Sequence, residues 1–150
     1  FALLYWTFNS FRNAAIVLLN VPFSMAGGLL ALYWRGINLS VSAAVGFISL
    51  FGVAVMAGVI FISEMEKRRW LSLGPPKAAV LEGACAELRP LLMLITVAML
   101  GMLPAALATG IGSDIQRPLA TVIVGGLFST LVLTGLALPC LYVTVHRLRK

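Results

Sequence analysis

Four stretches of this chain contain no Asp, Glu, Lys or Arg, and they are the feature that most limits its fold. They cover residues 13–34, 36–63, 90–113 and 118–145. Each exceeds the roughly 20 residues that a helix needs to cross the hydrocarbon core of a bilayer. Inside lipid, a helix satisfies all of its backbone hydrogen bonds within one segment. The sequence therefore predicts an all-α membrane protein, a multi-span bundle of transmembrane helices.

The composition agrees, because 61% of the 150 residues are hydrophobic and only 11% are charged, which is far from the balance of a soluble domain. We expect one membrane domain over residues 1–150, with residues 1–11 as the end of a helix that begins before this sequence. Transmembrane helices are predicted at 13–34, 41–63, 90–110 and 118–145. Residues 64–89 are predicted to form a connection between spans, with a short amphipathic helix along the membrane surface or an ordinary solvated helix.

Small residues and prolines within the spans mark places of close helix packing or of a kink. Glycine lets two helix backbones approach where lipid provides no hydrophobic drive for association, and proline removes one backbone donor. The predicted packing and kink residues are Pro22, Gly27, Gly28, Gly52, Gly58, Pro104, Gly125 and Gly126.

Uncharged polar residues also lie inside the predicted spans. Asn20, Thr96 and Thr130 can form hydrogen bonds between helices or line a wet path through the membrane. Interhelical bonding is the interpretation we favour, because buried polar side chains commonly join membrane helices.

Basic residues are distributed unequally between the two sides of the predicted bundle. Nine cations fall on one side and two on the other. By the positive-inside rule, the richer side is cytoplasmic, so the 64–89 connection and the C-terminus are expected in the cytoplasm. The nine are Arg12, Lys67, Arg68, Arg69, Lys77, Arg89, Arg147, Arg149 and Lys150; the two are Arg35 and Arg117.

No catalytic, cofactor or metal-binding motif occurs in the sequence. Its one histidine, His146, has no partner spacing suited to a metal site. Cys85 and Cys140 lack the spacing of a disulfide framework or metal site, and we expect them to act as small apolar filler. The cations flank apolar spans instead of forming a solvated basic face, which argues against nucleic-acid binding. We expect neither an enzyme nor a cofactor.

Several runs of residues, in order along almost the whole chain, are similar to one known family. They resemble the resistance-nodulation-division (RND) efflux pumps, in particular their heavy-metal cation efflux branch. The runs are residues 20–28 (NVPFSMAGG), 36–48 (GINLSVSAAVGFI), 51–55 (FGVAV), 82–84 (EGA), 88–93 (LRPLLM), 103–104 (LP), 109–120 (TGIGSDIQRPLA), 125–126 (GG) and 138–139 (LP).

The resemblance implies that this chain is the C-terminal membrane part of a larger proton-driven antiporter in the bacterial inner membrane. It further implies a homotrimer that works with a periplasmic adaptor and an outer-membrane channel, and an N-terminal half of the same transporter as partner. In the family, the proton-relay acids and the substrate sites lie outside this segment.

The sequence departs from the family pattern at two places. Many heavy-metal relatives have a polar or acidic residue in the stretch of the second span that Met56 and Ala57 occupy, and some have Lys or Thr near the start of the third span, where this chain has Leu91 and Leu94. Two alternatives to metal export therefore stay open. One is an inactive truncated remnant or a membrane assembly or scaffold protein, and the other is an RND pump for organic compounds.

Overall fold

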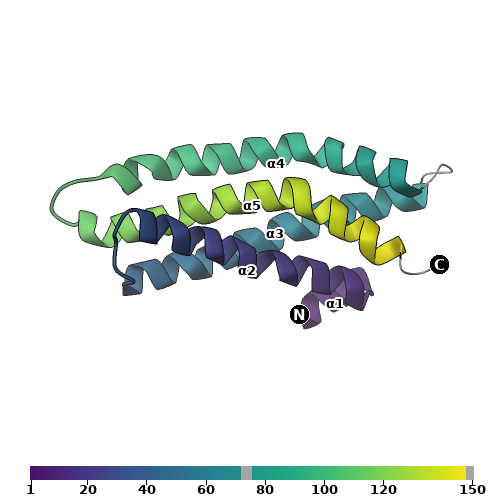
Figure 1. Cartoon of the computed structure of the whole chain (residues 1–150), viewed down its shortest axis with the longest axis horizontal. Coiled ribbons are helices and arrows are strands. Elements are labelled where there is room, and N and C mark those ends of the chain that lie inside the picture. Colours follow the sequence, from purple (N-terminus) through teal and green to yellow (C-terminus); the bar gives the residue numbers. More distant parts are fainter. Residues whose placement is uncertain (72–75, 148–150) are drawn as a thin grey trace.

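The computed structural model describes residues 1–71 and 76–147, and these residues are almost entirely helical. Figure 1 shows a bundle of long helices with one short helix beside its N-terminal end. The prediction of an all-α bundle is confirmed. The helices are α1 (Ala2–Phe8), α2 (Phe11–Trp34), α3 (Val41–Leu71), α4 (Pro76–Leu107) and α5 (Ser113–Arg147).

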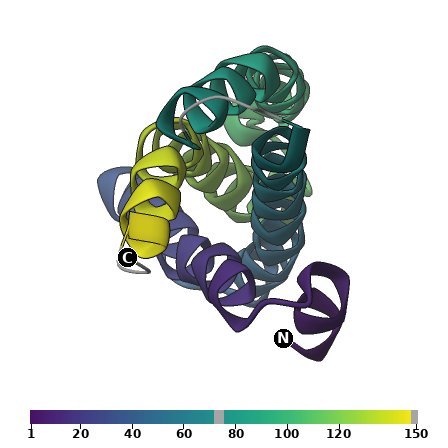
Figure 2. The ribbon, with the colours of Figure 1, turned by 90° about the vertical axis from the view of Figure 1, so that its right-hand side faces the viewer.

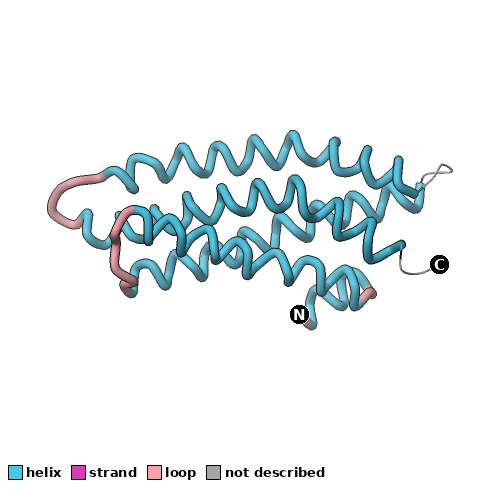
Figure 3. The backbone as a smooth tube through the Cα atoms, in the orientation of Figure 1, coloured by secondary structure: helices cyan, strands magenta, loops and turns pink. Residues whose placement is uncertain are grey.

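The four long helices run up and down along one axis. The loops between α2 and α3 and between α4 and α5 lie at the same end, which we call the turn end (Figure 3). At the other end, which we call the basic end, α3 and α5 finish and α2 and α4 begin (Figure 1). Seen along the bundle in Figure 2, the helices surround a common centre. Helix α5 contacts α2, α3 and α4, so it joins the bundle together.

Four helices are long and apolar enough to cross a membrane, judged by length and composition. They are Phe11–Trp34, Val41–Leu71, Leu81–Leu107 and Ser113–Ala137. Even the 24 residues of α2 extend about 36 Å at a rise of 1.5 Å per residue, which exceeds a hydrocarbon core of about 30 Å. Helices α3, α4 and α5 are longer still.

The connection predicted for residues 64–89 differs from the structure. Helix α3 continues through the charged residues to Leu71, where an Arg68–Glu64 ion pair of 3.0 Å joins successive turns. Helix α4 begins at Pro76 and passes through Pro90 without ending. The structure therefore has no separate surface helix in its described part: the predicted amphipathic segment is the first part of α4.

Two physical reasons explain the unbroken α4. Pro90 cannot bond to the carbonyl of Ala86, but Ala86 is exposed, so water or lipid headgroups can satisfy that oxygen. In addition, the first part of α4 packs on the end of α3. A Cβ atom on Gly83 would lie 3.4 Å from the Cα of Met65, and Ala84 is buried beside it. The predicted cytoplasmic cations Arg149 and Lys150 lie outside the described residues.

The interior of the bundle has two apolar clusters, one toward each end. The cluster near the basic end joins α1, α2, α3 and α4 around the fully buried Phe61. The other joins α2, α3, α4 and α5 around Leu50, Ile95 and Val122. The polar side chains described next belong to the α2–α5 interface.

Candidate functional site

Four polar side chains meet in the interface between α2 and α5. Asn20 and Ser24 lie four residues apart on α2, and Thr130 and Thr134 lie four residues apart on α5. Side chains at that spacing share one face of a helix. Asn20 is 5% exposed and the other three are fully buried. We call this group the polar seam.

Hydrogen bonds connect the seam across the two helices. The hydroxyl oxygens of Ser24 and Thr130 are 2.6 Å apart, and Thr130 Oγ1 lies 2.8 Å from the carbonyl oxygen of Gly126. If Ser24 donates to Thr130 and Thr130 donates to Gly126, each proton has one acceptor. One turn away, Asn20 Nδ2 donates to Thr134 Oγ1 over 3.4 Å. Ser24 and Thr130 thus find their partners within the protein, as an apolar interior requires.

The chemistry of these groups limits what the seam can do. Hydroxyls and a carboxamide neither gain nor lose a proton in the physiological range, so the seam has no titrating member. Its hydrogen bonds instead fix the register of α5 against α2. This supports the interhelical interpretation of Asn20 and Thr130, whereas Thr96 is exposed on α4 and takes no part in the seam.

Glycines bring the two helices close enough for the seam to form. A Cβ atom on Gly125 would lie 3.0 Å from the carbonyl oxygen of Gly27 and would overlap the Cβ of Ala31. A Cβ atom on Gly27 would overlap Ser129, whose hydroxyl donates to the carbonyl oxygen of Phe23 over 3.0 Å. The missing side chains at Gly27 and Gly125 therefore determine the α2–α5 distance.

The remaining predicted packing glycines have different surroundings. Gly28 and Gly126 accommodate side chains of α3, since a Cβ atom there would meet Phe47 and Leu50 respectively. Gly58 faces Val17 of α2, whose Cγ1 would lie 3.1 Å from an added Cβ. Gly52 has no neighbour within 4 Å of an added Cβ, so it packs against nothing in the described part of this chain.

The two predicted kink residues lie inside helices. Pro22 falls within α2 and Pro104 within α4. Each lacks the N–H that would bond to the carbonyl four residues earlier. Both helices nevertheless continue through the proline, and the kinks themselves stay a prediction.

Sequence reasoning missed three polar contacts. Thr134 belongs to the seam, and its spacing of four from Thr130 was the available signal. Asn13 Nδ2 donates to Glu66 Oε2 over 3.0 Å and joins α2 to the end of α3. Arg35 at the C-terminus of α2 donates to the carbonyl oxygen of Ala106 over 2.6 Å. No local pattern predicts the last two, because their partners are distant in sequence.

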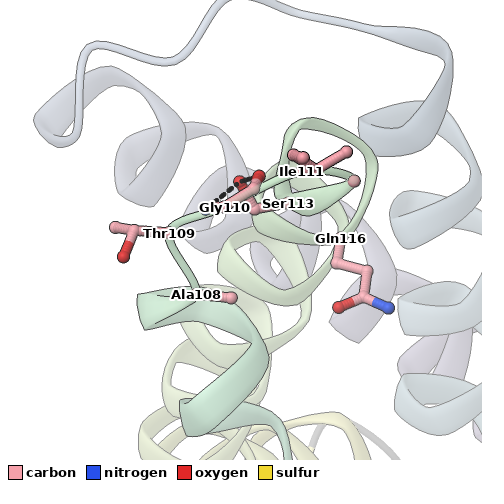
Figure 4. A pocket seen from close by; sticks show the side chains of 7 residues that line it. Ala108, Thr109, Gly110, Ile111, Ser113 and Gln116 are labelled. Carbon is pink, nitrogen blue, oxygen red and sulfur yellow. Dashed lines mark hydrogen bonds between the residues drawn. The ribbon is translucent and has the colours of Figure 1, made fainter.

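The glycine-rich turn before α5 encloses a small hollow of about 190 Å³ (Figure 4). There Ser113 Oγ accepts from the N–H of Gly110 over 3.2 Å and donates to the carbonyl oxygen of the same residue over 2.7 Å. Gly110 and Gly112 have φ angles of 152° and 90°, which favour glycine. These features are sufficient to explain the glycines as part of a turn that connects α4 to α5.

No metal centre is formed by the described part of the chain. Within it, His, Cys, Asp and Glu form no group of three or more that could hold an ion. Both cysteines are exposed, so the expectation that Cys85 and Cys140 fill the interior of this bundle is wrong.

The seam makes a direct prediction about stability. Ser24→Ala and Thr130→Val should couple in a double-mutant cycle on the complete protein, because each removes one end of the same hydrogen bond. We expect a coupling free energy of about 0.6 kcal/mol, and at most about 1.7 kcal/mol, the range found for hydrogen bonds between membrane helices. Reversible unfolding in dodecyl sulfate measures it.

The matched control pairs Ser49→Ala with Thr96→Val. Among the described residues, Ser49 bonds within its own helix, to the carbonyl oxygen of Val45, and Thr96 is exposed. This second pair should be additive. Additivity of the seam pair would show that its hydrogen bond does not hold the helices together.

Comparison with known proteins assigns the chain to a family. The model of the AcrB/AcrD/AcrF family matches residues 1–146. The chain is 47% identical over 147 residues to the cobalt-zinc-cadmium resistance protein CzcA of Cupriavidus metallidurans, covering 98% of this chain and 14% of that protein. It is 50% identical over 140 residues to the nickel and cobalt resistance protein CnrA of the same organism, covering 93% of this chain and 13% of the relative.

A more distant relative and a solved structure agree. The cation efflux system protein CusA of Escherichia coli is 32% identical over the full chain, which covers 16% of that protein. An X-ray crystal structure of a heavy metal efflux pump is 49% identical, with a TM-score of 0.87 over 97% of this chain and 14% of the pump. The chain thus has the length of only a small part of its relatives. It belongs to the AcrB/AcrD/AcrF family and is a multi-pass membrane segment of its RND heavy-metal efflux branch.

Proposed function

We propose that this chain is the C-terminal membrane part of an inner-membrane, proton-driven transporter that exports heavy-metal cations. The observation that carries the proposal is the similarity to a heavy-metal efflux pump along 97% of this chain at 49% identity, with a TM-score of 0.87. Metal resistance proteins of similar identity support the same cargo class.

The contribution of this chain to transport is mechanical. Its buried polar seam contains no titrating group, and the family resemblance places the acids of a proton relay outside this segment. On α3 and α4, the apolar side chains of Met56 and Leu94 are 62% and 55% exposed. We propose that this apolar face packs against the N-terminal half and transmits proton-linked helix shifts to the rest of the protein.

Charge supports a cytoplasmic basic end. Arg12, Lys67, Arg68, Arg69 and Arg147 flank the spans there, whereas Arg35 and Arg117 lie toward the turn end. With the positive-inside rule, the turn end faces the periplasm. Family membership supports a homotrimer that works with a periplasmic adaptor and an outer-membrane channel.

Metal accumulation tests the proposal. The complete open reading frame is expressed in a bacterial host without its own metal exporters, and cellular zinc, cobalt and cadmium are measured by mass spectrometry. We expect severalfold less metal than in cells with a frame that ends before this segment. A protonophore should abolish the difference, because export depends on the proton gradient.

Two results would contradict the proposal. Unchanged metal content, with the protein shown to be present in the membrane, would favour an inactive remnant or a scaffold protein. Unchanged metal content together with lower accumulation of an organic dye would favour a pump for organic compounds.

A further inference from the structure

A groove of about 850 Å³ lies between α2 and α5 with α4 at one side. Gly27 and Gly125 belong to its lining because the two helices touch there without side chains. Apolar residues such as Met99, Phe128 and Val132 supply most of the remaining surface. The groove is open, so a ligand can enter it from the side of the bundle.

A cation lies at one end of this groove. A second hollow, of about 190 Å³, shares Ala31, Trp34 and Gly125 with the groove and is also lined by Arg35. Arg35 Nη1 donates to the carbonyl oxygen of Ala106 over 2.6 Å and to Thr121 Oγ1 over 3.2 Å. These bonds hold the guanidinium beside the groove.

Arg35 keeps donors for a ligand. Both of its hydrogen bonds use a single nitrogen, and the residue is exposed. A guanidinium has five N–H donors in a geometry that suits phosphate. Among residues 1–71 and 76–147 the structure gives Arg35 no carboxylate partner, since the ion pair there joins Arg68 to Glu64. The end of the groove thus has a cation without an ion-pair partner among the described residues.

The position of the groove matches one leaflet of a bilayer. At its Arg35 end, Tyr33 and Trp34 are 87% and 91% exposed, as expected for aromatic residues at headgroup level. Along α5 the lining extends from Val124 to Leu133, about 14 Å at 1.5 Å per residue. That is about half of a 30 Å hydrocarbon core.

We propose that the groove binds one anionic phospholipid, with an acyl chain along Gly27 and Gly125 and the phosphate on Arg35. Length and charge favour this ligand over a helix from another part of the transporter. A transmembrane helix crosses both leaflets and needs an apolar contact along the whole bundle, whereas this groove covers one leaflet and ends at a guanidinium that keeps unused donors. The proposal depends on the membrane placement of the chain but not on the exported cargo.

The test uses the complete protein in nanodiscs that contain equal amounts of phosphatidylglycerol and phosphatidylcholine. Electron microscopy should show lipid density in the groove, with its headgroup at Arg35. Native mass spectrometry then compares retention of phosphatidylglycerol. We expect about fivefold weaker retention for Arg35→Ala, the effect of removing one basic contact to an anionic lipid, and partial rescue by Arg35→Lys.

A second variant keeps the test independent of Arg35, because Arg35 also bonds to the carbonyl oxygen of Ala106 near the end of α4. Val132→Phe fills the groove with Arg35 intact and should weaken retention as well. The matched control is Val97→Phe, because Val97 is an exposed α4 valine outside the lining. Arg12→Ala, at the basic end, controls for general loss of charge. Neither control should change retention.

Three results would overturn the proposal. They are a protein helix in the groove, a groove without lipid density, and equal retention of phosphatidylglycerol by wild type and both Arg35→Ala and Val132→Phe. Metal accumulation is also measured for the same variants. It tests the proposed function separately, because metal export can be measured whether or not the lipid binds.

Discussion

Gly125→Val is expected to separate α2 from α5 and to remove most of the folded transporter from the membrane. A Cβ atom at this position would lie 3.0 Å from the carbonyl oxygen of Gly27 and would overlap the Cβ of Ala31. Both obstacles are attached directly to the α2 backbone, so no side-chain rotation relieves them. Overpacking of a tight interior costs about 1–3 kcal/mol when neighbours can adjust, and we expect a larger loss here.

The measurement is fluorescence-detected size-exclusion chromatography of the complete protein after heating, with Gly125→Ala as an intermediate step. Ala15→Val is the control, since Ala15 is exposed on α2 and lies outside the face of α3 and α4 that is proposed to pack against the N-terminal half. It should change stability much less than Gly125→Val. Equal losses for Gly125→Val and Ala15→Val would show that α2–α5 contact is not what limits stability.

The sequence predicts the number and placement of the spans well because charge determines them. Removing a charged side chain from water into hydrocarbon is costly, so each long uncharged stretch has one favourable location. The C-terminal end of α2 at Trp34 and the beginning of α3 at Val41 match the prediction. Charge does not determine where a helix stops in water, and α3 therefore continues to Leu71.

Orientation of individual residues is harder to predict from this sequence. The spans are apolar around their whole circumference, so no periodicity separates the buried face from the face that contacts lipid. This explains why Asn20 and Thr130 lie in the seam while Thr96 is exposed, and why Gly125 is packed while Gly52 is open. Which of these residues is buried depends on the helix that packs against it, and the sequence of the span alone does not identify that helix. The hydrogen bond from Arg35 to Ala106 could not be predicted either, because the two residues are 71 positions apart in the sequence.

Helix α5 and its partner α2 form the most constrained pair of the bundle. Their interface contains the seam and the Gly27–Gly125 contact, whereas α4 is the least covered span, with 17% of its apolar window buried against 39% for the others. Within this chain, α4 is therefore held by the smallest buried surface, and α2 and α5 by the most specific contacts.

Phe61→Ala is expected to destabilise the basic end of the bundle by about 3–5 kcal/mol, the usual cost of removing a buried phenylalanine. Phe61 is fully buried on α3, among Leu4 of α1, Val17 of α2 and Ala84 of α4. Four helices thus contribute side chains to the cluster that contains the ring. Lipid cannot refill the space that the ring leaves, because the site has no exposed surface, and the lost dispersion contacts are not replaced.

Thermal unfolding of the complete protein measures the effect of Phe61→Ala, and the same change at exposed positions provides the control. Phe51 on α3 and Phe23 on α2 are 45% and 50% exposed, so lipid or another segment can cover the space left by either ring. Their alanine variants should lose much less stability than Phe61→Ala. If all three variants unfold together, the cluster around Phe61 does not hold α1 and α4 to the bundle, and its stability must come from the α2–α5 interface alone.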